Sequence, residues 1–154
     1  MKYIFLNLKR FDVPKELGGV NSIAPGKDWG SYIVKNTQEQ LKSYNPEEVE
    51  FVMFFPEAHI IGAVNALSEG SPVKIGCQGI FRDDTVVGGN FGAFTTNRTA
   101  NSMKALGCGG TIIGHCEERR DKLGIMQEAG VTDTDAVNRI LNKQVKCAIN
   151  AGLK

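Results

Sequence analysis

An imidazole, two carboxylates and two guanidinium groups follow one another between residues 115 and 120, in the segment His115-Cys116-Glu117-Glu118-Arg119-Arg120. The preceding run Thr111-Ile112-Ile113 is apolar and β-branched, which is typical of a buried strand, and it stops at Gly114. Folds that alternate strands and helices usually place their chemistry where parallel strands end. His115 is therefore a candidate catalytic residue. The alternative is a structural histidine that only completes local hydrogen bonds.

A second pair of candidate residues follows the first apolar run of the chain. The run from Tyr3 to Leu6 predicts a parallel strand that is covered on both faces. Strand alternation then puts Asn7 and Lys9 on the same face, just past the strand's end. Their shared face makes Asn7 and Lys9 candidate site residues. The alternative is a lysine in solvent.

Composition and charge exclude several classes of protein. The chain has 154 residues, a one-domain length, and its 18 basic and 17 acidic residues are well mixed, so nothing indicates a nucleic-acid partner or a membrane-surface partner. Its longest apolar stretches, such as 51–55, are far too short to span a bilayer, and the N-terminus has no secretory segment, so we expect a cytoplasmic protein. Four cysteines without a Cys-x-x-Cys pair indicate neither a metal site nor a disulfide framework.

The elements that must hold these residues alternate between strand and helix. Strands are predicted at 3–6, 49–55, 73–78 and 111–113, and helices at 29–44, 58–67, from Asn97 or Thr99 to 107, and from 132–135 to 152. A polar loop is expected after the fourth strand, and His59 is expected at a helix start or on the surface. This alternation favours an α/β fold with a parallel sheet, but leaves a barrel and a doubly wound sheet both open.

The motif Gly114-His115-Cys116-Glu117, followed by Arg119-Arg120, resembles the signature of the triosephosphate isomerase family. It departs from that signature twice, with Cys116 in place of a serine and one extra acidic residue before the arginine pair. Asn-x-Lys at 7–9 is similar to the end of the family's first strand. Gly-x-Gln at 76–78 and Gly-Ala-Phe-Thr at 92–95 resemble its third loop, which reaches into a neighbouring subunit beside the active site.

The resemblance implies a β/α barrel of which residues 1–154 form a single domain, the N-terminal half. A complete barrel has eight strands and about 250 residues, whereas this sequence supplies four strand–helix units. The family's catalytic glutamate and phosphate-binding loops would lie beyond Lys154. Phe94 and Thr95 would belong to the interface loop, so the resemblance implies a homodimer, or pairing with a C-terminal half-barrel.

The implied activity is that of an aldose–ketose isomerase of glycolysis and gluconeogenesis. It interconverts dihydroxyacetone phosphate and glyceraldehyde 3-phosphate through an enediolate, without a cofactor or a metal. By matching position, His115 would be the neutral electrophile, Lys9 the catalytic and substrate-binding cation, and Asn7 a substrate-binding residue, with Glu117 and Cys116 supporting them. The base has no candidate here, so we expect the 154-residue chain alone to be inactive.

Two other interpretations remain open. The long connection at 10–28 and the insertion at 83–90 resemble those of homologues that act on longer, four-carbon sugar phosphates. Alternatively, the chain could be a half-barrel module that binds or assembles without catalysis.

Overall fold

The four strands of the chain form one parallel sheet. The computed structural model describes residues 1–154, with β1 at Lys2–Asn7, β2 at Val49–Phe55, β3 at Val73–Cys77 and β4 at Gly110–Thr111. Each strand pairs with the next one in the sequence, in the order β1-β2-β3-β4. A doubly wound sheet reverses its strand order at a switch point, whereas a barrel adds each strand beside the last. The sheet is thus a curled half-barrel, as predicted.

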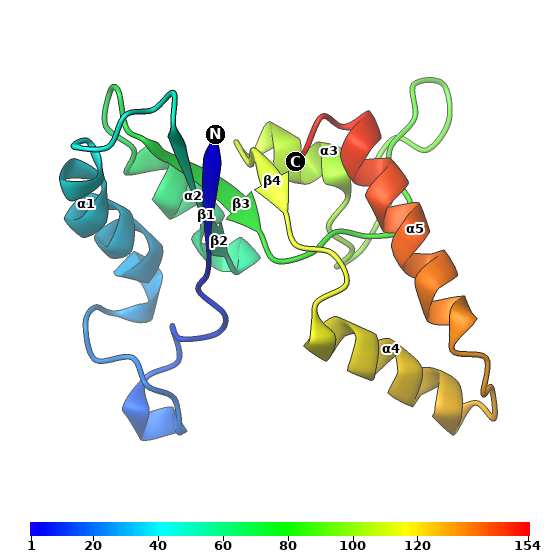
Figure 1. Ribbon diagram of the computed structural model, residues 1–154. Helices are drawn as coiled ribbons and strands as arrows, with labels where there is room; N and C mark the ends of the chain where they lie inside the picture. The colour runs from blue at the N-terminus through cyan, green and yellow to red at the C-terminus, as the bar shows by residue number, and fades with distance from the viewer.

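Helices follow every strand. They are α1 (Trp29–Leu41), α2 (Glu57–Asn65), α3 (Ala100–Ala105), α4 (Cys116–Glu128) and α5 (Asp135–Asn150), with short 3₁₀ turns η1 (Lys15–Leu17) and η2 (Gly26–Asp28) in the first loop. Figure 1 shows α1 and α2 beside the first strands, and α3 and α5 beside β4. No helix is long and apolar enough to cross a membrane. The cytoplasmic location expected from the sequence stays a prediction.

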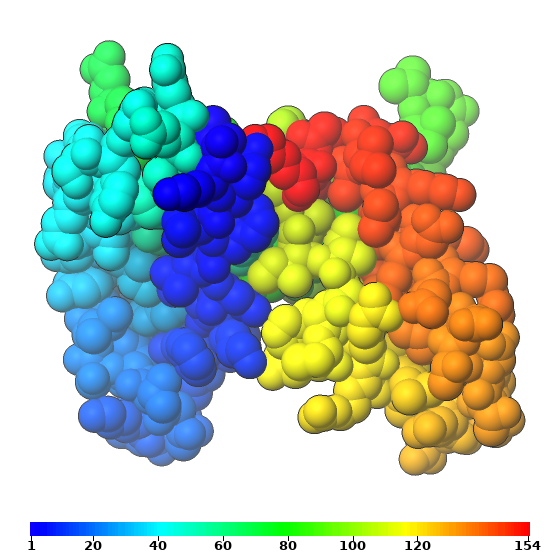
Figure 2. All heavy atoms as spheres, in the orientation of Figure 1, coloured from blue at the N-terminus to red at the C-terminus, as the bar shows by residue number.

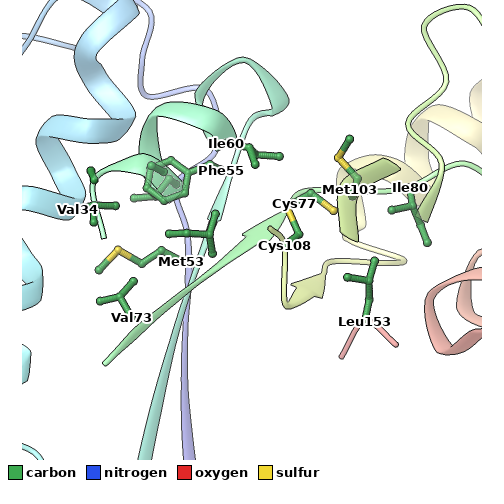
Figure 3. Close-up of a cluster of buried hydrophobic side chains, with 14 of the residues drawn as sticks. Val34, Met53, Phe55, Ile60, Val73, Cys77, Ile80, Met103, Cys108 and Leu153 are labelled. Atoms are coloured by element: carbon green, nitrogen blue, oxygen red, sulfur yellow. The ribbon is translucent and has the colours of Figure 1, made fainter. Parts of the chain in front are cut away.

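The core lies between the sheet and the helices that cover its outer face. Its side chains come from β2, β3, α1, α2, α3 and the end of α5, as the close-up in Figure 3 shows. The most deeply buried large members are Phe55, Ile60, Ile75, Met103 and Val34. Cys77 and Cys108 are buried in the same cluster and form no disulfide. This one cluster fixes the strands whose ends carry the candidate site.

The first strand differs from its prediction, because β1 is not covered on both faces. Its four apolar residues, Tyr3 to Leu6, are all exposed, and Phe5 keeps 61% of its surface accessible. β1 is an edge strand that pairs only with β2. Phe5 packs edge-on against Phe54 of the adjacent strand, with ring centroids 5.6 Å apart, and it stays exposed despite that contact. The prediction that both faces are covered is therefore wrong for residues 1–154.

The segment after the fourth strand also differs from its prediction. The expected polar loop is the 13-residue helix α4, and β4 contains only two residues. Helix α4 buries no residue, so it lacks the apolar stripe by which helices are predicted. Glu117 and Glu118 in its first turn complement the helix dipole, and hydrogen bonds from Arg119 to Asn138 and from Gln144 to Glu118 join it to α5. The loop prediction was wrong because such polar contacts leave no apolar pattern in the sequence.

Candidate active site

The end of β1 delivers Asn7 and Lys9 through a tight backbone turn. Lys9 has a positive φ of 48°, a backbone conformation that residues other than glycine rarely adopt. The Lys9 backbone N–H donates to Asn7 Oδ1 over 3.0 Å, and Gln78 Nε2 donates to the same oxygen over 3.1 Å. Gln78 also donates to the carbonyl oxygens of Lys9 and Phe54. This amide therefore joins the ends of three neighbouring strands and holds Lys9 in its strained turn.

His115 stands at the N-terminus of α4, directly after the end of β4. Gly114 has a φ of 75°, which only glycine adopts easily, and it turns the chain so that His115 becomes the N-cap residue. His115 Nδ1 accepts the backbone N–H of Glu117 over 3.3 Å. A neutral ring that accepts at Nδ1 carries its proton on Nε2. This geometry therefore assigns the Nε2–H tautomer to His115 and makes Nε2 the donor.

An ion pair joins the two strand ends. Lys9 Nζ lies 3.1 Å from Glu117 Oε1, and Glu117 Oε2 lies 3.4 Å from His115 Nδ1. The hydrogen bond from Lys9 lowers the pKa of Glu117, and the Lys9 charge adds to this effect. Glu117 therefore stays a carboxylate. It lies between the cation after β1 and the imidazole after β4, and 108 residues of sequence separate the two partners of the ion pair.

These residues line one open cavity of about 410 Å³. Its walls come from the first loop, Gln78, the end of β4 and the start of α4, and only two of its nine lining residues are hydrophobic. In the space-filling view, the molecule is hollowed between the first-loop segment (blue) and the region of α4 (yellow), as Figure 2 shows. The lining residues are Asn7, Lys9, Arg10, Phe11, Gln78, Ile112, His115, Glu117 and Glu118. The cavity is therefore polar, with two cations, Lys9 and Arg10, and two carboxylates, Glu117 and Glu118, around one open space.

The remaining predicted site residues lie outside this cavity. Cys116 is exposed, and its Sγ lies 3.8 Å from His115 Nδ1 without lining the cavity. In the predicted interface loop, Thr95 is exposed and the Phe94 ring packs edge-on against Phe81, with centroids 5.5 Å apart. Neither touches the cavity. The subunit contact expected of Phe94 and Thr95 stays a prediction. No cluster of side chains suited to a metal is present.

His59 lies at the start of a helix, one of the two predicted alternatives, and it is buried rather than on the surface. It lies in the first turn of α2, keeps 6% of its surface accessible and makes a 2.9 Å contact from Nε2 to Asp12 Oδ2. Its ring also packs on Trp29, with centroids 5.1 Å apart. Asp12 belongs to the long first loop, 47 residues away, which no local pattern could reveal. The Asp12–His59 contact therefore joins the loop that follows Lys9 to helix α2.

The sequence is similar to known proteins of one family. The family model described as triosephosphate isomerase matches residues 28–154. A triosephosphate isomerase from Bdellovibrio bacteriovorus is 28% identical over 123 residues, which are 71% of this chain and 48% of that protein. One from Dictyoglomus turgidum is 30% identical over 87 residues, which are 56% of this chain and 31% of that protein.

A solved structure agrees at the level of the fold. The triosephosphate isomerase structure from Bartonella henselae superposes with a TM-score of 0.63 at 22% identity, covering 99% of this chain and 48% of that one. The chain spans about half the length of that protein and at most about half of these curated relatives. The chain belongs to the triosephosphate isomerase family, and residues 1–154 correspond to the N-terminal half of that family's barrel.

Proposed function

We propose that this chain supplies the electrophilic half of an isomerase site that interconverts a ketose phosphate and an aldose phosphate. The observation that carries the proposal is the meeting of Lys9 and His115 in one cavity, linked by Glu117. Lys9 follows the edge strand β1, and His115 follows the other edge strand, β4. Neither side chain belongs to the hydrophobic core. Substrates of this kind are the small phosphorylated sugars that the names of the relatives imply.

The proposed chemistry follows from the charges in the cavity. Moving a carbonyl group to the neighbouring carbon requires removal of a carbon-bound proton, and negative charge then develops on the two adjacent oxygens as an enediolate. Donors that are already aimed at such charge lower the barrier most. His115 Nε2–H would donate to one of these oxygens, and the Lys9 ammonium would stabilise the charge. Asn7 orients Lys9 through its bond to the Lys9 backbone.

The proton-abstracting base has no free candidate among the carboxylates of the cavity. Glu117 is paired with Lys9, and both oxygens of Glu118 accept hydrogen bonds. We infer that the base comes from the other half of the barrel. The 154-residue chain should then show negligible turnover by itself and should become active when it is joined to the C-terminal half of a family member.

The direct test is a coupled assay with dihydroxyacetone phosphate and glyceraldehyde 3-phosphate. The chain alone, the C-terminal half of the Bdellovibrio bacteriovorus protein alone, and the two mixed or fused would be compared. Activity that appears only when both halves are present supports the proposal. Turnover by the 154-residue chain alone would refute the division of the site, and an assembled but inactive barrel would refute the isomerase assignment.

A four-carbon sugar phosphate is the second candidate substrate. The observation that favours it is the contribution of the long first loop to the cavity, where Arg10 and Phe11 both line the wall. Arg10 adds a second cation beside Lys9 and could hold an additional oxygen of a longer substrate. Comparing kcat/KM for triose and tetrulose phosphates in the completed barrel separates the two. An Arg10→Ala variant should weaken turnover of the longer substrate more than that of the shorter one.

We also propose that further barrel strands pair with the free edges of β1 and β4 and cover the exposed apolar residues of β1. The apolar residues of β1 and the free edges of β1 and β4 are the surfaces that would be covered. Unpaired strand edges and apolar patches favour association. A homodimer formed through the loop of Phe94 and Thr95 is a separate proposal. Light scattering of the chain, alone and with the C-terminal half, tests both.

A purely assembling module is the remaining alternative. Such a module would need only a partner that covers the exposed residues of β1, and it would need no particular side chain at position 115. His115→Gln in the completed barrel distinguishes the two functions, because the side chain is partly exposed and the barrel should still assemble. Under our proposal, kcat falls by about 100- to 1,000-fold, the usual effect of removing one such donor.

A further inference from the structure

Glu118 is the additional acidic residue of the His115 segment, and its carboxylate joins three parts of the chain. Oε2 accepts the backbone N–H of Gly114 over 2.7 Å. Oε1 accepts from Lys122 Nζ and from Gln144 Nε2, each over 2.8 Å. Gln144, on α5, also donates to the backbone oxygen of Ile80 in the third loop. One carboxylate therefore connects the end of β4, helix α4 and helix α5, and through Gln144 it reaches the third loop.

The peptide groups of Gly114 are held from both sides. Glu118 accepts from its N–H, while Arg119 Nε donates to its carbonyl oxygen over 2.8 Å. Arg119 is itself fixed, because its NH1 group donates to Asn138 Oδ1 on α5 over 2.9 Å. Gly114 has a positive φ of 75° and immediately precedes His115. The two side chains thus clamp the turn that decides where the imidazole points.

The charge of Glu118 suits this role, and the hydrogen bonds to both of its oxygens argue against a role as proton-abstracting base. Burial acts to raise the pKa of Glu118, but hydrogen bonds from Lys122, Gln144 and the Gly114 N–H outweigh it, so the pKa is lowered. Its side chain is 20% exposed, and Gln144 is only 4% exposed. Glu118 is therefore a carboxylate whose two oxygens are already occupied, and a charged acceptor makes the Gly114 bond stronger than a neutral one would.

We propose that Glu118 is a positioning residue that sets the Gly114–His115 turn and, through it, the Nε2–H tautomer and aim of His115. Lys122 and Gln144 hold the carboxylate in place, so α5 supports the site without touching the cavity. The role of the turn in catalysis rests on the proposed function, whereas the control of the turn by Glu118 does not. Glu118 also occupies the third position of α4, from which an acidic side chain commonly reaches back to the helix start.

The test uses the 154-residue chain and three variants. Glu118→Gln keeps the shape, but its amide cannot accept from both Gly114 and Lys122. Lys122→Met keeps the carboxylate and removes one of its partners. Glu128→Gln is the control, because Glu128 lies on the same helix and makes no side-chain hydrogen bond or ion pair. The readouts are hydrogen exchange at the Gly114 amide and the ¹⁵N shifts of the imidazole rings, of which the chain has two.

We expect Glu118→Gln to speed Gly114 exchange by about tenfold, because a neutral amide oxygen that Gly114 and Lys122 compete for holds the N–H less tightly than a carboxylate does. The His115 nitrogen shifts should move from those of a single Nε2–H tautomer towards an average of both forms. Lys122→Met should change both readouts less, and Glu128→Gln should change neither. A role confined to helix stability would speed exchange throughout α4 without moving the tautomer.

The proposal is overturned if Glu118→Gln folds and leaves the Gly114 exchange and the His115 shifts at wild-type values. If that variant fails to fold, Lys122→Met decides, and unchanged signals in it are the contradicting result. These readouts need no turnover, so they separate two failures. If the completed barrel assembles but does not isomerise, only the proposed function is refuted. If the barrel is active but the His115 shifts are unchanged in Glu118→Gln, only the positioning role of Glu118 is refuted.

Discussion

Removing the His59 side chain should destabilise the protein far more than an ordinary substitution. In His59→Ala, the Asp12 carboxylate stays buried at 8% exposure, and its Oδ1 already lacks a partner. Oδ2 would keep only the Arg10 guanidinium, 2.7 Å away and largely in solvent. Losing a hydrogen bond to a buried charged group costs about 1.5–3 kcal/mol. Because Asp12 is already short of one partner, we expect the upper part of that range, about 3 kcal/mol.

The protein carries its own probe for this measurement. Trp29 is the single tryptophan, is 2% exposed and packs directly on the His59 ring. Urea unfolding followed by tryptophan fluorescence reports the loss, and a chain of this size should melt roughly 6–12 °C lower. The matched comparison is the double variant Asp12→Ala/His59→Ala, which removes the stranded charge and should be more stable than His59→Ala. A loss below about 1 kcal/mol, or additive effects in the cycle, would refute the buried pair.

Three further outcomes are expected. Gly76→Ala should lower the free energy of unfolding by about 1–3 kcal/mol, because a Cβ there would lie 2.5 Å from the Phe54 ring. Gly62→Ala is the control: it lies in mid-helix with its nearest neighbour 3.9 Å away, so urea unfolding should show it neutral or stabilising. The hydrogen bond from Lys74 lowers the pKa of Glu50, so its contribution is present above the unfolded value of 4.5 and is lost as the pH falls through the folded pKa; Glu50→Gln should flatten that acid limb in urea midpoints taken from pH 6 to pH 3. A thiol reagent should modify exposed Cys116 first and Cys147 slowly, because burial raises the pKa of Cys147, with the two remaining thiols reacting only on unfolding, as mass spectrometry would show.

The sequence predicted best those elements whose character is local. β2 begins and ends at the predicted residues because nearly every one of its side chains is buried, so all of its residues except Glu50 are apolar. Thr99 caps α3 as expected, and its side chain accepts from the Ser102 N–H. The exposure of β1 was not predictable, because an apolar strand sequence does not show which residues pack against it. Helix α4 was missed because capping charges leave no apolar period.

The candidate site divides in the same way. The strand-end rule and the family motif brought Asn7, Lys9 and His115 together, and the structure places all three around one cavity. The contacts that hold them were not foreseen. Gln78 was recognised only as part of a loop motif, although it fixes the turn at Lys9. The Asp12–His59 pair depends on a long-range contact, and single-sequence patterns do not encode such contacts.

Under the proposed function, Lys9 and His115 act together on one developing negative charge. A kinetic double-mutant cycle in the completed barrel distinguishes joint from independent action. We predict that Lys9→Met and His115→Gln each lower kcat/KM for the sugar phosphate by about 100-fold or more. The double variant should lose less than the product of the two, because groups that act on one transition state are not additive. A barrel that keeps kcat/KM within about twofold of the parent in either single variant would contradict the account.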